Sequence, residues 1–135
     1  KYIPSIAFSS CDYDPQADLS ALRPFVRQVT EKVFAEGLPK GTCLNVNFPK
    51  GSEFRGIKVC RMTYGRWTNE VVDCQHPRGG KYYWMVGHFH NDEPEAVDTD
   101  QWALSHGYIS ITPTKAVTPS TIDVTDYELM RKLKF

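Results

Sequence analysis

The chain has 135 residues, of which 41% are hydrophobic, so it suits one domain, or part of one, with an apolar core. Its 16 basic and 16 acidic side chains balance, which argues against a nucleic-acid polymer held by net charge. No apolar run approaches the ~20 residues that a membrane-spanning helix needs, so no membrane partner is expected.

The four cysteines are Cys11, Cys43, Cys60 and Cys74, and they contain no Cys-x-x-Cys pair. This spacing argues against a zinc ribbon or a redox motif. We therefore predict reduced and mostly buried thiols in a cytoplasmic protein.

The first predicted element is a strand over residues 3–9, which is apolar on both faces. Such a strand is typical of the interior of a parallel sheet covered by helices. Because an inner strand needs neighbours on either side, we expect a portion of the sheet to precede Lys1. Ser9 and Ser10 end this strand, where open α/β sheets bind ligands, so we predict that they line the rim of a substrate cleft. They lack a Gly-x-Ser-x-Gly elbow and a triad, so we assign them no chemical role.

An amphipathic helix is predicted next, because apolar side chains recur at intervals of three and four residues. These residues are Leu22, Phe25, Val26, Val29, Val33 and Phe34. Pro24 fits within a first turn, so we expect the helix to start with Ser20 as its cap and to end at Gly37. Residues 44–48 alternate apolar side chains with two asparagines, which predicts a strand with one polar face. Strand, helix and strand form one βαβ unit, expected to be right-handed.

From residue 56 onward, strands are predicted at 57–64, 71–72 and 82–86 with no helices between them, which indicates an extended antiparallel arm. Large aromatic side chains are dense in this arm, and a lone hairpin cannot bury so many rings. Tryptophan and tyrosine are enriched where protein surfaces meet. We therefore predict that an interface between copies of the protein is formed by Trp67, Tyr82, Tyr83 and Trp84.

Two closely spaced pairs of side chains invite a metal-binding interpretation. His88 and His90 begin a segment, residues 88–97, that we interpret as a solvated loop, because no third ligand is well placed and imidazole suits zinc better than Mg²⁺ or Mn²⁺. Asp98 and Asp100 are spaced to hold a hard divalent cation. However, Asp98 and a glutamine three residues later form a capping-box pattern. We therefore predict a helix start at Asp98 and no metal site at either pair.

The last predicted elements are a strand over residues 108–112 and a short C-terminal helix. The strand is expected to stop at Pro113, because proline cannot donate to a strand ladder. Thr125 and Glu128 form a second capping-box pattern near the end of the chain. A helix that short is not stable alone, so we expect it to dock on this subunit or on another.

The order and spacing of several short motifs resemble a known family. The motifs are Leu44-Asn45-Val46-Asn47-Phe48-Pro49, Pro77-Arg78-Gly79, Tyr82-Tyr83-Trp84, Asp98-Thr99-Asp100, Gly107 and Ser110-Ile111-Thr112-Pro113. Together they resemble the C-terminal half of the SurE (survival protein E) family of metal-dependent 5′/3′-nucleotidases, over nearly all of the chain. Departures from the family pattern at His76, Thr114 and residues 117–119 affect the expected route of the tail.

The resemblance implies an α/β fold, namely the second part of a Rossmann-like three-layer domain with an extended antiparallel β arm and a C-terminal tail helix. In that scheme, residues 1–55 end the Rossmann-like core and residues 56–97 form the arm and its loop. Residues 98–113 return a helix and a strand to the core, and residues 114–135 form the tail. The arm and the tail would take part in exchange between subunits, giving a homodimer or a homotetramer.

The resemblance also implies that the full-length protein hydrolyses nucleoside monophosphates with a divalent ion, Mg²⁺ or Mn²⁺. The family's metal ligands are two adjacent aspartates, a serine and an asparagine, which we expect before Lys1. No catalytic or metal-binding residue is therefore assigned within this chain, which alone is expected to be inactive. The competing interpretation is a non-catalytic module that binds copies of itself, and an upstream aspartate pair would distinguish the two. The preferred nucleotide and metal stay open, as does dimer against tetramer.

Overall fold

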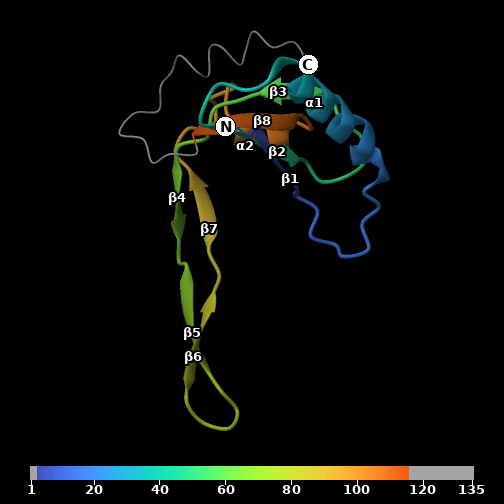
Figure 1. The fold of residues 1–135 in the computed structure, drawn as a ribbon. Coiled ribbons are helices and arrows are strands. Elements are labelled where there is room, and N and C mark those ends of the chain that lie inside the picture. The colour runs from blue at the N-terminus through green and yellow to red at the C-terminus, as the bar shows by residue number, and fades with distance from the viewer. Residues whose placement is uncertain (1–2, 116–135) are drawn as a thin grey trace. The chain divides into compact units, whose positions relative to one another are not determined.

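The computed structural model describes residues 3–115, which fall into two compact units (Figure 1). The first unit comprises residues 3–62 and 96–115, and the second comprises residues 63–95. The C-terminal helix expected from Thr125 lies outside the described residues.

The first unit is built on a four-stranded mixed sheet. In spatial order its strands are β1 (Ser5–Ser10), β2 (Thr42–Phe48), β8 (Ile109–Lys115) and β3 (Ile57–Val59). β1 runs parallel to β2, β8 runs antiparallel to β2, and β3 runs parallel to β8. The expected α/β class is thus confirmed. The sequence predicts β1 as an inner strand, whereas among the described residues it lies at an edge of the sheet.

A helical segment connects β1 to β2 and completes the expected βαβ unit. It opens with a 3₁₀ turn, η1 (Ser20–Leu22), and continues as α1 (Arg23–Glu36), with Pro24 in the first turn as predicted. Ser20 does not cap the helix, because the residue at the N-cap position of α1 is Leu22 and no side chain makes a capping hydrogen bond there. The Ser20 hydroxyl instead donates to the Asp18 carboxylate at 2.9 Å. At the other end, Gly37 takes a φ of 76°, and its N–H donates to the Val33 carbonyl. This left-handed conformation favours glycine, which explains why the helix stops there.

The hydrophobic core of this unit lies between α1 and one face of the sheet. The buried residues that form it are Val29, Val33, Leu44, Val46, Phe48, Ile109 and Ile111. The alternation in β2 is therefore confirmed, because its apolar residues are buried and its two asparagines are only half-buried. One member of the predicted helix stripe behaves differently, since Phe34 is 91% exposed.

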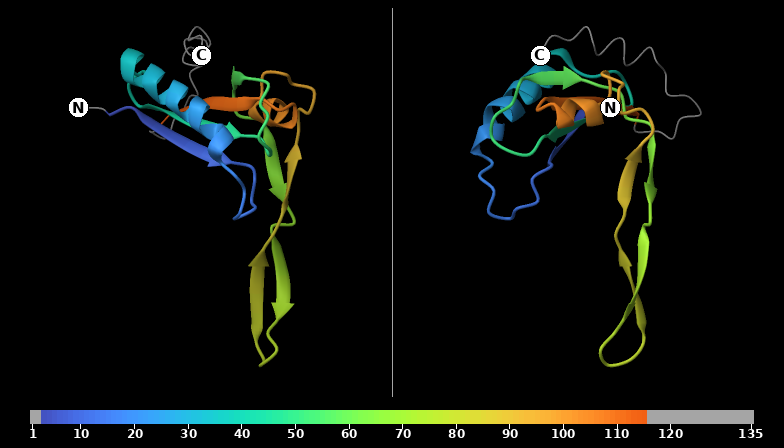
Figure 2. Two further views of the ribbon diagram at one scale, coloured as in Figure 1. Left: turned by 90° about the vertical axis from the view of Figure 1, so that its right-hand side faces the viewer. Right: turned by 180° about the vertical axis from the view of Figure 1, so that it is seen from behind.

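The short helix α2 (Asp100–Ser105) packs on β8, on the side of the sheet away from α1 (Figure 2). Ser110 and Thr112 point to that side and are buried. The cap of α2 is Thr99 rather than the predicted Asp98. The Thr99 hydroxyl accepts a hydrogen bond from the Trp102 N–H at 3.3 Å. Asp98 instead pairs with Arg61. The sheet thus has a helix against each face, as the three-layer expectation requires.

β8 continues through Pro113 to Lys115, so the predicted stop at this proline is wrong. The Ile109 N–H donates to the Gly56 carbonyl, and the Ile111 carbonyl accepts from the Cys60 N–H, so odd-numbered residues of β8 direct their backbone groups toward β3. By the same alternation, the missing N–H of Pro113 faces the β3 side, beyond the last β3 residue in register. Proline is tolerated where the ladder has no partner.

The second unit consists of two successive pairs of antiparallel strands in one long hairpin (Figure 2). β4 (Gly65–Thr68) pairs with β7 (His88–Asn91), and β5 (Val71–Gln75) pairs with β6 (Lys81–Met85). Antiparallel pairing is as predicted. The loop predicted over residues 88–97 is wrong for its first four residues, which form β7. The hairpin begins at residue 63, because β3 belongs to the four-stranded sheet.

A small aromatic contact orders the first part of the hairpin. The rings of Trp67 and Phe89 meet edge to face, with their centroids 5.8 Å apart. The Phe89 ring also lies over Gly65, where an added Cβ would be 2.4 Å from the ring and from the His90 carbonyl oxygen. Only glycine fits at this position, because any side chain would overlap the Phe89 ring.

Candidate functional site

The carboxyl ends of β1 and β2 lie together at one edge of the first unit. In the parallel register Ser9 is opposite Asn47, and Ser10 is opposite Phe48. The Ser10 hydroxyl accepts the Asp12 N–H at 3.1 Å, so this side chain shapes the following loop. Ser9 is exposed, and within residues 3–115 its hydroxyl makes no hydrogen bond. Both serines thus lie at the carboxyl end of the strand, and Ser9 is the more exposed of the two. Their place at the rim of a substrate cleft stays a prediction.

Asn47 and Asn45 are functional candidates that sequence reasoning missed. Both project from the face of β2 opposite the apolar core, beside Ser9 and Ala7 of β1. Their amides make no hydrogen bond to any described residue. The alternating sequence identified a polar face, but only the register with β1 shows that it lies next to Ser9.

The same polar face continues onto β8. Ser110 is opposite Asn47, and Thr112 is opposite Asn45. The hydroxyls of both β8 residues are buried and have no hydrogen-bond partner among the described residues. A buried polar group without a partner costs free energy, so these groups usually mark a position that water or a ligand completes. The face therefore carries one row of hydrogen-bonding side chains across β1, β2 and β8, namely Ser9, Asn47 and Ser110. A shorter second row consists of Asn45 and Thr112.

Asp98 and Asp100 each accept hydrogen bonds from other groups of the protein. Arg61 donates to both oxygens of Asp98, through Nε at 2.9 Å and Nη2 at 3.1 Å. Asp100 lies in the first turn of α2, where a carboxylate favours the helix dipole, and it accepts the Gln101 N–H. In the described part of the chain, no three His, Cys, Asp or Glu side chains are grouped to hold a metal ion.

Two histidines of the second unit, His88 and His90, lie on one face of β7. His88 and His90 are two residues apart on β7, opposite Thr68 and Arg66. His90 Nε2 is 3.4 Å from an Asp92 oxygen, and the same oxygen is paired with Arg66. His90 thus lies beside an exposed ion pair, and our interpretation that the two imidazoles are not metal ligands stays a prediction.

None of the four cysteines is in a disulfide. Burial raises the pKa of Cys60 to about 12, so this thiol is protonated and unreactive at neutral pH. Burial also raises the pKa of Cys11. Neither has the character of a nucleophile.

The four aromatic residues proposed as an interface are exposed in the second unit. Tyr82 is 41% exposed, and Trp67, Tyr83 and Trp84 are between 58% and 65% exposed. On the β5–β6 pair, Tyr82 and Trp84 share one face while Tyr83 projects from the other. Apolar surface is therefore offered on both faces of the hairpin.

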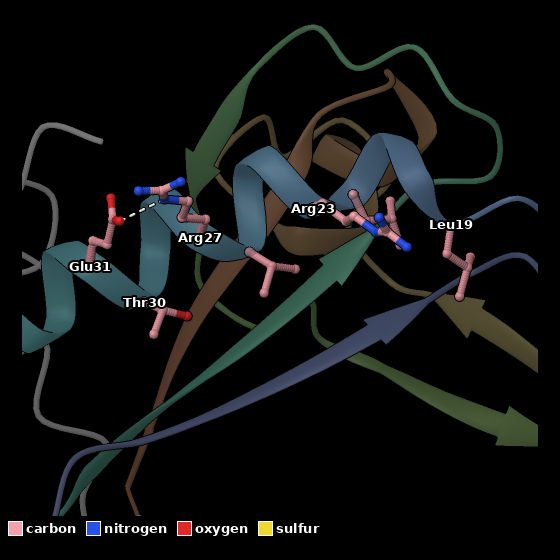
Figure 3. Close-up of a pocket in the computed structure, with 7 residues that line it drawn as sticks. Leu19, Arg23, Arg27, Thr30 and Glu31 are labelled. Carbon is pink, nitrogen blue, oxygen red and sulfur yellow. Dashed lines mark hydrogen bonds and ion pairs between the residues drawn. The ribbon is translucent and has the colours of Figure 1, made fainter.

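Two grooves flank α1. One, of about 600 Å³, runs along the helix, and its lining includes Arg27 and Glu31, which form an ion pair (Figure 3). The other, of about 500 Å³, lies at the outer edge of β1 and includes Ile6, Phe8 and the exposed Phe34. Neither groove contains a group of side chains arranged for catalysis. No helix among the described residues is long and apolar enough to cross a membrane.

Comparison of the sequence with known proteins identifies one family. The family profile described as "Survival protein SurE" matches residues 1–69. The chain is 49% identical over 134 residues to the 5′-nucleotidase SurE of Phocaeicola vulgatus, covering 99% of this chain and 50% of that protein. It is 43% identical to the 5′-nucleotidase SurE of Bacteroides fragilis, and the match covers 98% of this chain and 49% of that protein.

A solved structure shows the same likeness. The SurE protein from Aquifex aeolicus superposes with a TM-score of 0.63 at 31% identity, covering 97% of this chain and 50% of that one. The chain thus spans about half the length of the curated relatives that it matches.

Proposed function

The chain belongs to the SurE family, and from this premise we propose that it is the portion of a nucleoside monophosphate phosphohydrolase that supplies sheet, cleft wall and subunit interface. The observation that carries the proposal is the 49% identity to a 5′-nucleotidase over 99% of the chain. The carboxyl edge of β1 and β2 supports it, because open α/β sheets bind ligands at that edge. There, Ser9 and Asn47 would hydrogen-bond the substrate without performing the chemistry.

We propose that hydrolysis depends on a divalent ion, Mg²⁺ or Mn²⁺, which would neutralise charge on the phosphoryl oxygens. The described residues do not fit a site for this ion, because Asp98 is committed to Arg61 and no group of three ligands is present among them. Hard cations of this kind take oxygen ligands that include carboxylates. We therefore place the ligands in the half of the relatives that this chain does not match.

We further propose that the exposed aromatic residues of the hairpin join copies of the protein into a dimer or tetramer. The exposure of Trp67, Tyr83 and Trp84 supports this role, because aromatic side chains are enriched in interfaces. The same observation favours the second candidate function, a non-catalytic module for self-association. The four free thiols support a reducing compartment such as the cytoplasm.

Complementation tests the proposed function directly. The chain is produced together with the unmatched half of the Phocaeicola vulgatus protein, and phosphate release from nucleoside monophosphates is measured with Mn²⁺ and with a chelator. We expect turnover only when both parts and the metal are present, and a reduced kcat/KM for Asn47→Ala. The matched control is Gln28→Ala, which removes an exposed amide side chain from α1. Association without turnover would favour the non-catalytic module, whereas turnover by this chain alone would contradict our placement of the catalytic groups.

A further inference from the structure

A cluster of cationic and aromatic side chains lies at the β3 side of the first unit. We name it the donor cluster, and its members are Arg55, Lys58, Trp102 and Tyr108. The Arg55 guanidinium lies over the Tyr108 ring at 5.0 Å from its centroid. The Lys58 ammonium is 5.0 Å from the Trp102 centroid and 6.0 Å from the Tyr108 centroid. Both cations are therefore held at one ring rather than spread over the surface.

The rings of the donor cluster are themselves fixed in place. Trp102 and Tyr108 are nearly parallel, with an interplanar angle of 21°. His106 stacks on the indole at 3.9 Å, and its Nδ1 lies 2.8 Å from the Trp102 carbonyl oxygen, so Nδ1 donates. Arg55 also packs along Gly107, where its side-chain carbons would be 3.6 Å from an added Cβ. The cations thus rest on a preformed aromatic surface, which lowers the entropy cost of binding a ligand.

The side chains of the donor cluster offer mainly hydrogen-bond donors and positive charge. The guanidinium, the ammonium, the indole N–H and the phenol hydroxyl can all donate hydrogen bonds. Within the described part of the chain, none of the four groups makes a hydrogen bond, and neither cation forms an ion pair. By contrast, the carboxylate of Asp98 is already held by Arg61. The cluster therefore has donors and positive charge without an acceptor to satisfy them.

We propose that the donor cluster is a binding site for a phosphate group. A phosphate offers several charged acceptor oxygens, and arginine and lysine recognise it through charge-assisted hydrogen bonds. Stacking of a nucleobase is not part of the site, because His106 occupies one face of the indole and Arg55 lies over the phenol ring. The ligand is thus selected by its phosphate, whether this is free or esterified.

The inference stands apart from the proposed nucleotidase function. The sheet order places β3 and β1 at opposite edges, with β2 and β8 between them. The two serines and the asparagines of the substrate cleft therefore take no part in the donor cluster. A failure of either proposal leaves the other to be judged on its own measurement.

The test is a titration of the protein with inorganic phosphate at constant ionic strength. Two-dimensional NMR follows the Trp102 indole N–H and the Tyr108 ring resonances. We expect saturable shifts with phosphate and with a nucleoside monophosphate, and none with the nucleoside or with chloride. If the nucleoside monophosphate alone produced shifts, recognition would extend to the base and the assignment to a phosphate site would be overturned.

Matched variants make the test specific. Arg55→Gln combined with Lys58→Met should weaken phosphate binding at least about tenfold, because charge-assisted hydrogen bonds are lost. Lys58→Arg keeps a cation over the rings and should bind as the wild type does, and Lys50→Met is the control for loss of a cation outside the cluster. An unaltered affinity in the double variant, an equal loss in Lys50→Met, or equal shifts with chloride would each overturn the proposal.

Discussion

Asp98→Asn tests whether the Asp98 carboxylate stabilises the fold through its ion pair with Arg61. The substitution removes the charge that receives two hydrogen bonds from Arg61, at 2.9 Å and 3.1 Å. A shielded hydrogen bond to a charged group contributes about 1.5–3 kcal/mol, whereas an exposed ion pair contributes about 0.2–1 kcal/mol. The two side chains are 30% and 46% exposed, so we discount the larger figure and expect a loss of about 1 kcal/mol in the free energy of unfolding.

The fold should survive this loss, because backbone bonds join the same segments. The Arg61 N–H donates to the Asp98 carbonyl at 3.1 Å, and the Asp100 N–H donates to the Arg61 carbonyl at 3.0 Å. Urea denaturation is the assay, and about 1 kcal/mol corresponds to a fall of about 0.5–1 M in the midpoint. Asp73→Asn, at an exposed position of the hairpin, is the matched control and should be neutral.

A double-mutant cycle with Arg61→Gln isolates the pair from other effects. We expect Asp98→Asn to cost little once Arg61 is absent, and Mn²⁺ binding by the complemented protein to be unchanged. An unchanged urea midpoint together with a large loss of Mn²⁺ affinity would refute the reasoning and return Asp98 to the metal site.

Four further variants test other parts of the structure. Gly65→Ala should destabilise the hairpin by about 1–3 kcal/mol, seen as faster amide exchange there, because its Cβ would overlap a ring; unchanged exchange would contradict this. Because the pKa of Cys60 is raised from 9.0 to about 12, the contribution of this thiol to stability is constant below pH 9 and falls as pH rises toward about 12; Cys60→Ala should flatten that fall in alkaline urea titrations. Trp84→Ala should lower the oligomer mass measured by light scattering at micromolar concentration, and an unaltered mass would count against the interface. Changing His88 and His90 to alanine should leave metal content unaltered, as measured by elemental analysis of the complemented protein.

The sequence correctly predicted the elements that depend on the spacing of neighbouring residues and on local backbone geometry. In β2, the spacing of Leu44, Val46 and Phe48 matches the burial in the structure, and Pro24 located the first turn of α1. These signals succeed because period and backbone geometry are local properties.

The missed features depend on partners that are distant in sequence. Asp98 is a residue type that often caps helices. However, its carboxylate pairs with Arg61, 37 residues earlier in the sequence, and Thr99 caps α2 instead. Likewise, Pro113 stops a ladder only if a strand lies on its N–H side, and the short β3 leaves that side unpaired. Asn47 became a candidate only once the register placed it beside Ser9.

The paired backbone segments at Arg61 and Thr99 also bear on how such a chain changes length during evolution. They form a parallel bridge at the point where the polypeptide leaves the sheet and returns to it. The entropy cost of closing a loop grows only slowly with its length, by about 0.6 kcal/mol for each doubling. Insertions or deletions between these two positions therefore change the free energy of pairing β3 with β8 only slightly. The hairpin can be lengthened, shortened or exchanged while the sheet keeps its register.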